Sequence, residues 1–139
     1  MMGRTQGHDV QKILDEPAEM RDGTVLRSDI YRPFGGGDHP VLVSRTPYDK
    51  ASNEEMGRGL AERGYVVIVQ DIRGRYTSEG EFKWQFQDSS ETFDAQDGYD
   101  TAEWAATLSG SDGQVGTWGH SYPAWCSWWL ASARPPSLK

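Results

Sequence analysis

Ser121 is the residue in this chain best suited to do chemistry, and it lies in the segment Gly119-His120-Ser121-Tyr122-Pro123. Residues 115–118 are short and β-prone, and apolar residues recur at helical spacing from Tyr122, so the sequence predicts a strand, a tight turn and a helix. A serine at the tip of such a turn holds its hydroxyl above the sheet edge, as in a nucleophile elbow. Gly119 suits this turn because a side chain there would collide with the facing turn. On this motif alone, however, a serine that caps the helix N-terminus is the commoner explanation.

Composition limits the classes of protein that this chain belongs to. Its 139 residues suit one domain, and 36% of them are hydrophobic, so the chain is long and apolar enough to bury a core. The net charge of -7 argues against nucleic acid or an anionic membrane surface as a partner. A single cysteine, Cys126, excludes an intrachain disulfide framework. No apolar run approaches membrane-spanning length and the start lacks a secretory signal, so we expect a cytoplasmic protein.

The order of predicted elements indicates an α/β fold. Residues 1–11 are expected to be a frayed terminus, and residues 12–139 to form a partial domain. Arg21-Asp22-Gly23 predicts a hairpin turn, followed by a strand over residues 24–31. Residues 41–43 and 65–71 are continuously apolar, which is typical of strands that are covered on both faces in a parallel sheet.

Three helices are expected between and after these strands. The first has a capping box formed by Ser52 and Glu55, and it ends near Gly64. The second begins near Asp94 or Asp97, and the third follows Ser121. Their apolar stripes are predicted to contain Met56 and Leu60 in the first helix, Thr101, Trp104, Ala105 and Leu108 in the second, and Trp125, Trp128, Trp129 and Ala133 in the third.

Six short motifs in one order resemble the N-terminal part of a known family. The motifs are Met20-Arg21-Asp22-Gly23, Tyr31-Arg32-Pro33, Arg45-Thr46-Pro47-Tyr48-Asp49-Lys50, Gln70-Asp71-Ile72-Arg73-Gly74, Ser78-Glu79-Gly80-Glu81-Phe82 and Gly119-His120-Ser121-Tyr122. The family is the CocE/NonD type of serine hydrolase, which contains cocaine esterase, α-amino-acid ester hydrolases, glutaryl acylases and Xaa-Pro dipeptidyl-peptidases. The resemblance covers about residues 20–139 and implies an α/β-hydrolase fold. It departs from the family pattern at Ala124, where the family has a second elbow glycine, which implies slightly looser packing of helix on strand.

The resemblance also implies roles for three residues. Ser121 would be the nucleophile that attacks an ester or amide carbonyl. The backbone N–H of Tyr122 and the hydroxyl of Tyr48 would form the oxyanion hole. The position of Tyr48, after a central strand and before a helix, is also where this fold places its second oxyanion donor. Without the resemblance, an aromatic plug beside the sheet is the simpler explanation of Tyr48.

No histidine in the chain is a credible general base for Ser121. His8 lies in the expected frayed terminus, His39 in a glycine-rich loop, and the side chain of His120 should point away from the hydroxyl of its neighbour. In this fold the catalytic acid and histidine follow the serine, so we expect them beyond residue 139. The chain is therefore interpreted as the N-terminal piece of a serine hydrolase that acts on small ester, amide or peptide substrates. The alternative is an inactive fragment or interaction protein that keeps half of the fold.

The remaining candidates favour structural explanations. Cys126 is expected to be a small buried residue. Asp71 and Arg73 are predicted to form a local ion pair. Acidic residues that recur every third position wind around a helix instead of converging on a metal, and they suit a helix N-terminus; they are Asp88, Glu91, Asp94, Asp97, Asp100 and Glu103. No metal or cofactor is expected, and the oligomeric state is not predicted.

Overall fold

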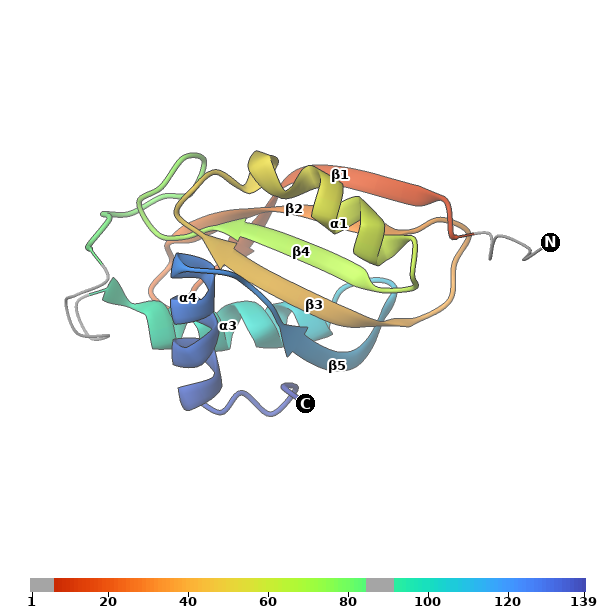
Figure 1. Ribbon diagram of the computed structural model, residues 1–139. Helices are drawn as coiled ribbons and strands as arrows, with labels where there is room; N and C mark the ends of the chain where they lie inside the picture. Colours follow the sequence, from red (N-terminus) through yellow and green to blue (C-terminus); the bar gives the residue numbers. More distant parts are fainter. Residues whose placement is uncertain (1–6, 85–91) are drawn as a thin grey trace.

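The computed structural model describes residues 7–84 and 92–139, which form a five-stranded mixed sheet with helices on both faces (Figure 1). The strands follow the order β1-β2-β4-β3-β5 across the sheet. The first two, β1 (Val10–Glu19) and β2 (Val25–Pro33), form an antiparallel hairpin whose turn has Gly23 at φ 86°. The next three, β3 (His39–Thr46), β4 (Val66–Asp71) and β5 (Ser111–Thr117), are mutually parallel where they pair. This architecture confirms the predicted α/β fold.

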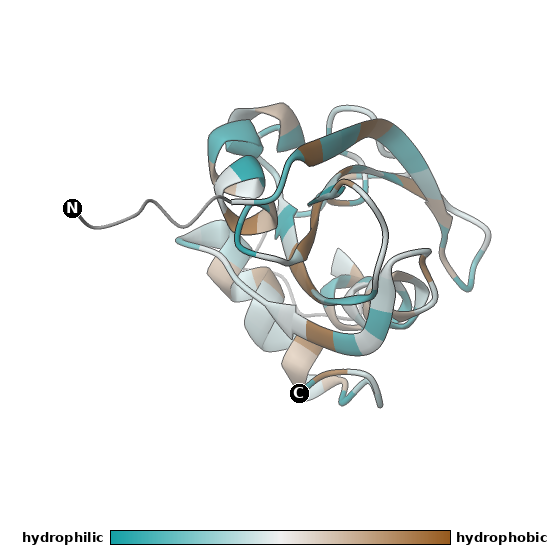
Figure 2. Cartoon of the chain, turned by 90° about the vertical axis from the view of Figure 1, so that its right-hand side faces the viewer, coloured by the Kyte–Doolittle hydropathy of each residue, from teal (hydrophilic) through white to brown (hydrophobic). Residues whose placement is uncertain are grey.

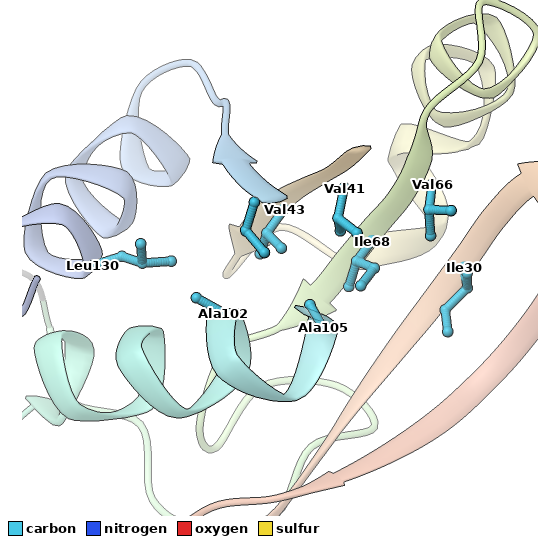
Figure 3. Close-up of a cluster of buried hydrophobic side chains, with 9 residues drawn as sticks. Ile30, Val41, Val43, Val66, Ile68, Ala102, Ala105 and Leu130 are labelled. Atoms are coloured by element: carbon cyan, nitrogen blue, oxygen red, sulfur yellow. The ribbon is translucent and has the colours of Figure 1, made fainter. Parts of the chain in front are cut away.

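β4 is covered on both faces, as its continuous apolarity predicts. Val66 and Ile68 face a cluster with Ala102 and Ala105 of α3 (Asp94–Ala106) and Leu130 of α4 (Tyr122–Ser132), as Figure 3 shows. Val67 and Val69 face the opposite way, toward Ala61 of α1 (Glu54–Ala61). Every residue of β4 is buried. The alternation of side chains along a strand explains why both faces must be apolar when helices lie above and below.

Hydropathy follows this layering. The most hydrophobic segments lie on the strands in the middle of the molecule, whereas the loops are predominantly hydrophilic (Figure 2). None of the helices in the described ranges, 7–84 and 92–139, is long and apolar enough to cross a membrane.

The ends of several elements differ from the expectation. β1 begins at Val10, so Val10 and Gln11 belong to a strand and not to a frayed terminus; they pair with Pro33 and Arg32. The predicted capping box is wrong, because Ser52 lies within a short 3₁₀ helix, η1 (Lys50–Asn53), and its hydroxyl donates to the carbonyl of Asp49. Tertiary pairing and the tight turn after β3 override these local signals.

The predicted stripes of two helices are only partly correct, since Leu60 of α1 and Trp125 of α4 pack against the core as expected but other members do not. In α1, Gly57 and Ala61 are buried whereas Met56 is 54% exposed, because the ring of Tyr31 fills the space directly above Gly57. The end of α1 is as expected, with Gly64 at φ 97° donating its N–H to the carbonyl of Ala61. In α4, Cys126 and Leu130 are buried whereas Trp128 is 79% exposed. The predicted stripe of α3 is confirmed: Thr101 and Ala105 are buried, and Trp104 and Leu108 pack against the cluster.

The outer edge of β5 is partly paired by the last residues of the chain. The N–H of Val115 donates to the carbonyl of Ser137, and the N–H of Lys139 donates to the carbonyl of Val115. The side chain of Glu103 in α3 fixes this segment by accepting from both the N–H and the hydroxyl of Ser137.

Candidate active site

Ser121 occupies a strained position between β5 and α4. Its φ of 63° and ψ of -125° are values that residues other than glycine rarely adopt. It stands at the N-cap position of α4, yet its side chain makes no capping hydrogen bond. The explanation of this serine as a helix cap therefore does not fit the structure. The strained turn leaves the hydroxyl available for another role, as a nucleophile elbow does.

Gly119 is required by the close approach of α4 to the end of β5. A Cβ atom at position 119 would lie 2.6 Å from Cβ of Pro123 and 2.7 Å from its carbonyl carbon. Because one of these is a backbone atom, no side-chain rotation relieves the clash. The expected collision with a facing turn is thus with the first turn of α4, and it keeps the loop before Ser121 tight.

The hydroxyl of Tyr48 lies 3.4 Å from Oγ of Ser121, although 73 residues separate the two in sequence. Tyr48 follows β3, and its backbone N–H donates to Oγ1 of Thr46 over 3.0 Å. The tyrosine is 51% exposed, so it is not a buried plug beside the sheet. Its ring meets the ring of Tyr122 edge-on, with centroids 6.3 Å apart. The structure therefore brings together the three residues that the sequence singled out.

Tyr122 contributes both a backbone N–H and a buried ring to this arrangement. It is the first residue of α4, so its N–H is one of the helix-end donors that have no partner inside the helix. Its side chain is buried, and its hydroxyl has no hydrogen-bond partner among the described residues. Burial raises the pKa of this hydroxyl well above its usual value, so it stays protonated. The rings of Phe82 and Trp84 pack against Tyr122, with centroids 6.4 and 5.8 Å away.

A groove of about 430 Å³ lies beside Tyr48. Its wall is formed by the end of β3, the turn after β5, the start of α4 and the residues around η1 and α1, among them Thr46, Tyr48, Met56, His120 and Pro123. Its volume is in the range of sites for small ligands, about 300–1,000 Å³. Tyr48 lines this groove but Ser121 does not, so the groove lies beside the tyrosine and next to the turn that carries the serine.

The three histidines do not provide a base for Ser121. His8 and His39 contact each other with ring centroids 5.7 Å apart. His39 pairs with Ser111 at the start of β5, whereas Ser121 follows the end of that strand. The two histidines therefore lie at the opposite ends of the parallel strands from Ser121. His120 is exposed, in the turn next to Ser121. Within residues 7–84 and 92–139, no imidazole lies within hydrogen-bond distance of the serine hydroxyl.

Asp71 and Arg73 make separate contacts, so the predicted local ion pair is wrong. Arg73 pairs with Asp97 of α3 over 2.8 Å and with Asp22 of the hairpin turn over 2.8 Å. The guanidinium holds the pKa of Asp22 at about 2, and the two carboxylates raise the pKa of Arg73. Asp71 instead accepts from the N–H of Lys50 and from Thr77. Arg73 sits between elements that are far apart in sequence, a pairing that local spacing does not reveal.

The acidic residues of α3 have structural partners. Asp97 is fully buried and pairs with Arg73, and Asp94 accepts from the indole N–H of Trp125 over 3.2 Å. Asp94 and Asp97 lie in the first turn of α3, which confirms that acidic residues enter this helix at its N-terminus; both are also buried against donors from other elements. Asp88 and Glu91 lie outside the described residues. Within the described residues, no group of three or more His, Cys, Asp or Glu side chains is arranged to hold a metal ion.

Cys126 is buried, and burial raises the pKa of its thiol to about 12. A thiol with so high a pKa is a poor nucleophile at neutral pH. This matches the expectation of a small buried residue.

Comparison with known proteins identifies the family. The model of the X-Pro dipeptidyl-peptidase family, S15, matches residues 22–139, which is most of the chain. This chain belongs to the S15 family. It is also similar to the cocaine esterase of Rhodococcus sp. (strain MB1 Bresler), with 36% identity over 126 residues.

Solved structures agree with this family. The whole of this chain superposes on part of an α-amino acid ester hydrolase, with a TM-score of 0.83 and 30% identity. It superposes on a CocE/NonD family hydrolase from Staphylococcus aureus with a TM-score of 0.78 and 29% identity over 95% of its length. The fold is accordingly that of the α/β-hydrolases, and the family consists of esterases and peptidases.

The chain corresponds to only part of each relative. The match to the cocaine esterase includes 86% of this chain but only 21% of the esterase. The superpositions include 26% of the ester hydrolase and 30% of the S. aureus protein. The family match at residues 22–139 contains β2 to β5 and the turn that follows β5, and the superposition on the ester hydrolase also includes β1.

Proposed function

We propose that this chain supplies the nucleophile and the oxyanion hole of a serine hydrolase that cleaves small ester, amide or peptide substrates by acyl transfer. One observation carries the proposal. The hydroxyl of Ser121, on a strained turn and free of a capping bond, lies 3.4 Å from the hydroxyl of Tyr48. Membership of the S15 family supports the same chemistry, because relatives in it are named as esterases and ester hydrolases.

Each residue has a separate step in the proposed reaction. Oγ of Ser121 attacks the substrate carbonyl, and the carbonyl oxygen takes up the negative charge. The hydroxyl of Tyr48 and the N–H of Tyr122 donate to this oxygen, and the N-terminus of α4 adds its favourable dipole. The leaving group departs, and water then releases the acyl group from the serine. Because donors fixed in place stabilise the transition state more than the substrate, both should act mainly on kcat.

A general base and its acidic partner are needed to move the proton of Ser121. We propose that they are a histidine and an aspartate outside these 139 residues, in the part of the relatives that the chain does not cover. Residues 12–139, together with Val10 and Gln11 of β1, are then the N-terminal part of the hydrolase domain. The alternative is an inactive fragment or interaction protein that keeps half of the fold. In that case Ser121 would not react as a nucleophile even when the rest of the domain is present.

Labelling with a fluorophosphonate distinguishes these two possibilities. The experiment requires a full-length hydrolase, by which we mean this chain joined to the remainder of the domain, for example a chimera in which residues 22–139 replace the matching part of the Rhodococcus cocaine esterase. We expect the label on Ser121 and its loss in Ser121→Ala. Labelling that persists in Ser121→Ala contradicts the assignment of the nucleophile, and a well-folded protein that takes no label supports the inactive alternative.

A further inference from the structure

Lys50, two residues after Tyr48, has its ammonium group buried among three carboxylates. Its side chain is 6% exposed, and Nζ lies 2.7 Å from Oδ1 of Asp15, 3.5 Å from Oδ1 of Asp29 and 3.6 Å from Oδ2 of Asp71. Lysine is almost never buried this deeply unless it is paired. The ion pairs therefore fix the start of η1 against the sheet.

The three carboxylates belong to three different strands. Asp29 is in β2, Asp71 is the last residue of β4, and Asp15 lies where the register of β1 shifts, with φ 55°. The backbone N–H of Asp15 donates to Oδ1 of Asp29, which ties the main chain of β1 to the carboxylate of β2. Because β1, β2 and β4 are neighbours in the sheet, these carboxylates form one rigid platform.

Asp71 also holds the main chain of the same loop. Its Oδ1 accepts from the backbone N–H of Lys50 over 2.9 Å, and its Oδ2 accepts from the hydroxyl of Thr77 over 2.8 Å. Asp71 is fully buried, so these bonds are shielded from water. The loop is thus attached to the sheet at Lys50 through both its side chain and its backbone.

Tyr48 has few contacts of its own that could fix its hydroxyl. The residue is half exposed, and its ring touches Tyr122 on one edge. Between Tyr48 and Lys50 stands Asp49, whose φ of 79° and ψ of 113° lie outside the regions that residues other than glycine normally adopt. A backbone held in such a conformation must be restrained on both sides. Thr46 restrains it before Tyr48, and Lys50 restrains it after.

We propose that Lys50 is a positioning residue, whose ion pairs with Asp15, Asp29 and Asp71 hold the loop so that the hydroxyl of Tyr48 stays beside Ser121. The inference rests on the proposed oxyanion role of Tyr48. Its physical basis is that a displacement of about 1 Å at a catalytic group can lower the rate about 10²-fold. A lysine that acts in this way changes the rate only through the tyrosine hydroxyl.

A double-mutant cycle in the full-length hydrolase tests this dependence. Lys50→Met, Tyr48→Phe and the double variant are compared by kcat and KM for p-nitrophenyl acetate. We expect Lys50→Met to lower kcat by about 10- to 100-fold with little change in KM. In the Tyr48→Phe background the same substitution should lower kcat by less than about threefold, because no hydroxyl remains to be displaced.

A milder variant covers the case in which Lys50→Met does not fold. Asp15→Asn removes the shortest of the three ion pairs, and the side chain of Asp15 is 55% exposed, so the fold should tolerate the change. We expect a loss of a few-fold in kcat that disappears in the Tyr48→Phe background. Arg21→Met is the matched control, since it breaks the 2.7 Å ion pair between Arg21 of the hairpin turn and Asp100 of α3 and should leave kcat unchanged.

The outcomes separate the inference from the proposed function. If Lys50→Met or Asp15→Asn lowers kcat equally with tyrosine and with phenylalanine at position 48, the contribution of Lys50 is structural and the inference is overturned. It is also overturned if neither variant changes kcat. If Tyr48→Phe alone leaves kcat unchanged, the oxyanion role of Tyr48 fails first, and the inference fails with it.

Discussion

Replacing Tyr48 by phenylalanine tests the oxyanion hole with the smallest possible change. The substitution removes the hydroxyl that lies 3.4 Å from Oγ of Ser121 and keeps the ring that packs on Tyr122. Loss of one oxyanion donor typically lowers kcat about 10²- to 10³-fold, or about 2.7–4 kcal/mol in the activation free energy. We expect a loss of this size in the full-length hydrolase, with a much smaller change in KM because the donor acts chiefly in the transition state.

The free energy of unfolding should change little in the same variant. Tyr48 is 51% exposed, and the contact of its hydroxyl with Ser121 is long for a hydrogen bond. A hydrogen bond of good geometry contributes about 0.5–1.5 kcal/mol to stability, so we expect a loss of less than about 1 kcal/mol. The fall in kcat should therefore greatly exceed the fall in stability.

Steady-state hydrolysis of p-nitrophenyl acetate and a thermal melt are the two measurements. Tyr76→Phe is the matched control, because Tyr76 is similarly exposed, at 59%, in the loop after β4. A kcat for Tyr48→Phe within a few-fold of wild type would refute the oxyanion role. A parallel fall of kcat and melting temperature would show that the hydroxyl is structural.

Three further predictions concern the 139-residue chain itself. Because no histidine is placed to act as its base, the isolated chain should show no hydrolysis of p-nitrophenyl acetate that Ser121→Ala abolishes. Gly119→Ala should destabilise the chain by about 1–3 kcal/mol in denaturant unfolding, since the new Cβ meets backbone at 2.7 Å, whereas Gly59→Ala on α1 should not. Arg73 lowers the pKa of Asp22 from 3.8 to about 2, so this stabilisation is complete above about pH 4 and is lost as the pH falls toward 2; Asp22→Asn should lose less stability over that window.

Signals that act over a few residues were readable in the sequence. Continuous apolarity predicts that β4 is buried on both faces, and Gly64 predicts the end of α1. The short strand, the turn at Ser121 and the helix after it were also predicted, although on that motif alone a helix cap was the commoner explanation of the serine. Each depends on backbone chemistry or side-chain periodicity within one element, so no knowledge of distant residues is needed. The family resemblance then added Tyr48 as a candidate, and its role remains a prediction.

Local patterns failed where a distant element decides the outcome. Ser52 and Glu55 have the spacing of a capping box, yet the 3₁₀ turn after β3 places Ser52 inside another helix. Met56 has helical spacing with Leu60, but the ring of Tyr31 selects Gly57 as the residue that faces the sheet. The partner of a side chain across the fold cannot be read from spacing in one segment.

The sequence by itself determined the elements, their order and the identity of the serine at the turn. Only the tertiary structure decided that Tyr48 comes within 3.4 Å of Ser121 and that Lys50 is enclosed by carboxylates from three strands. The physical reason is that β3 and β5 are adjacent and parallel, so the residues that follow their carboxyl ends meet at one edge of the sheet. Strand order and register set these distances, and both arise from packing of the whole sheet and not from any one segment.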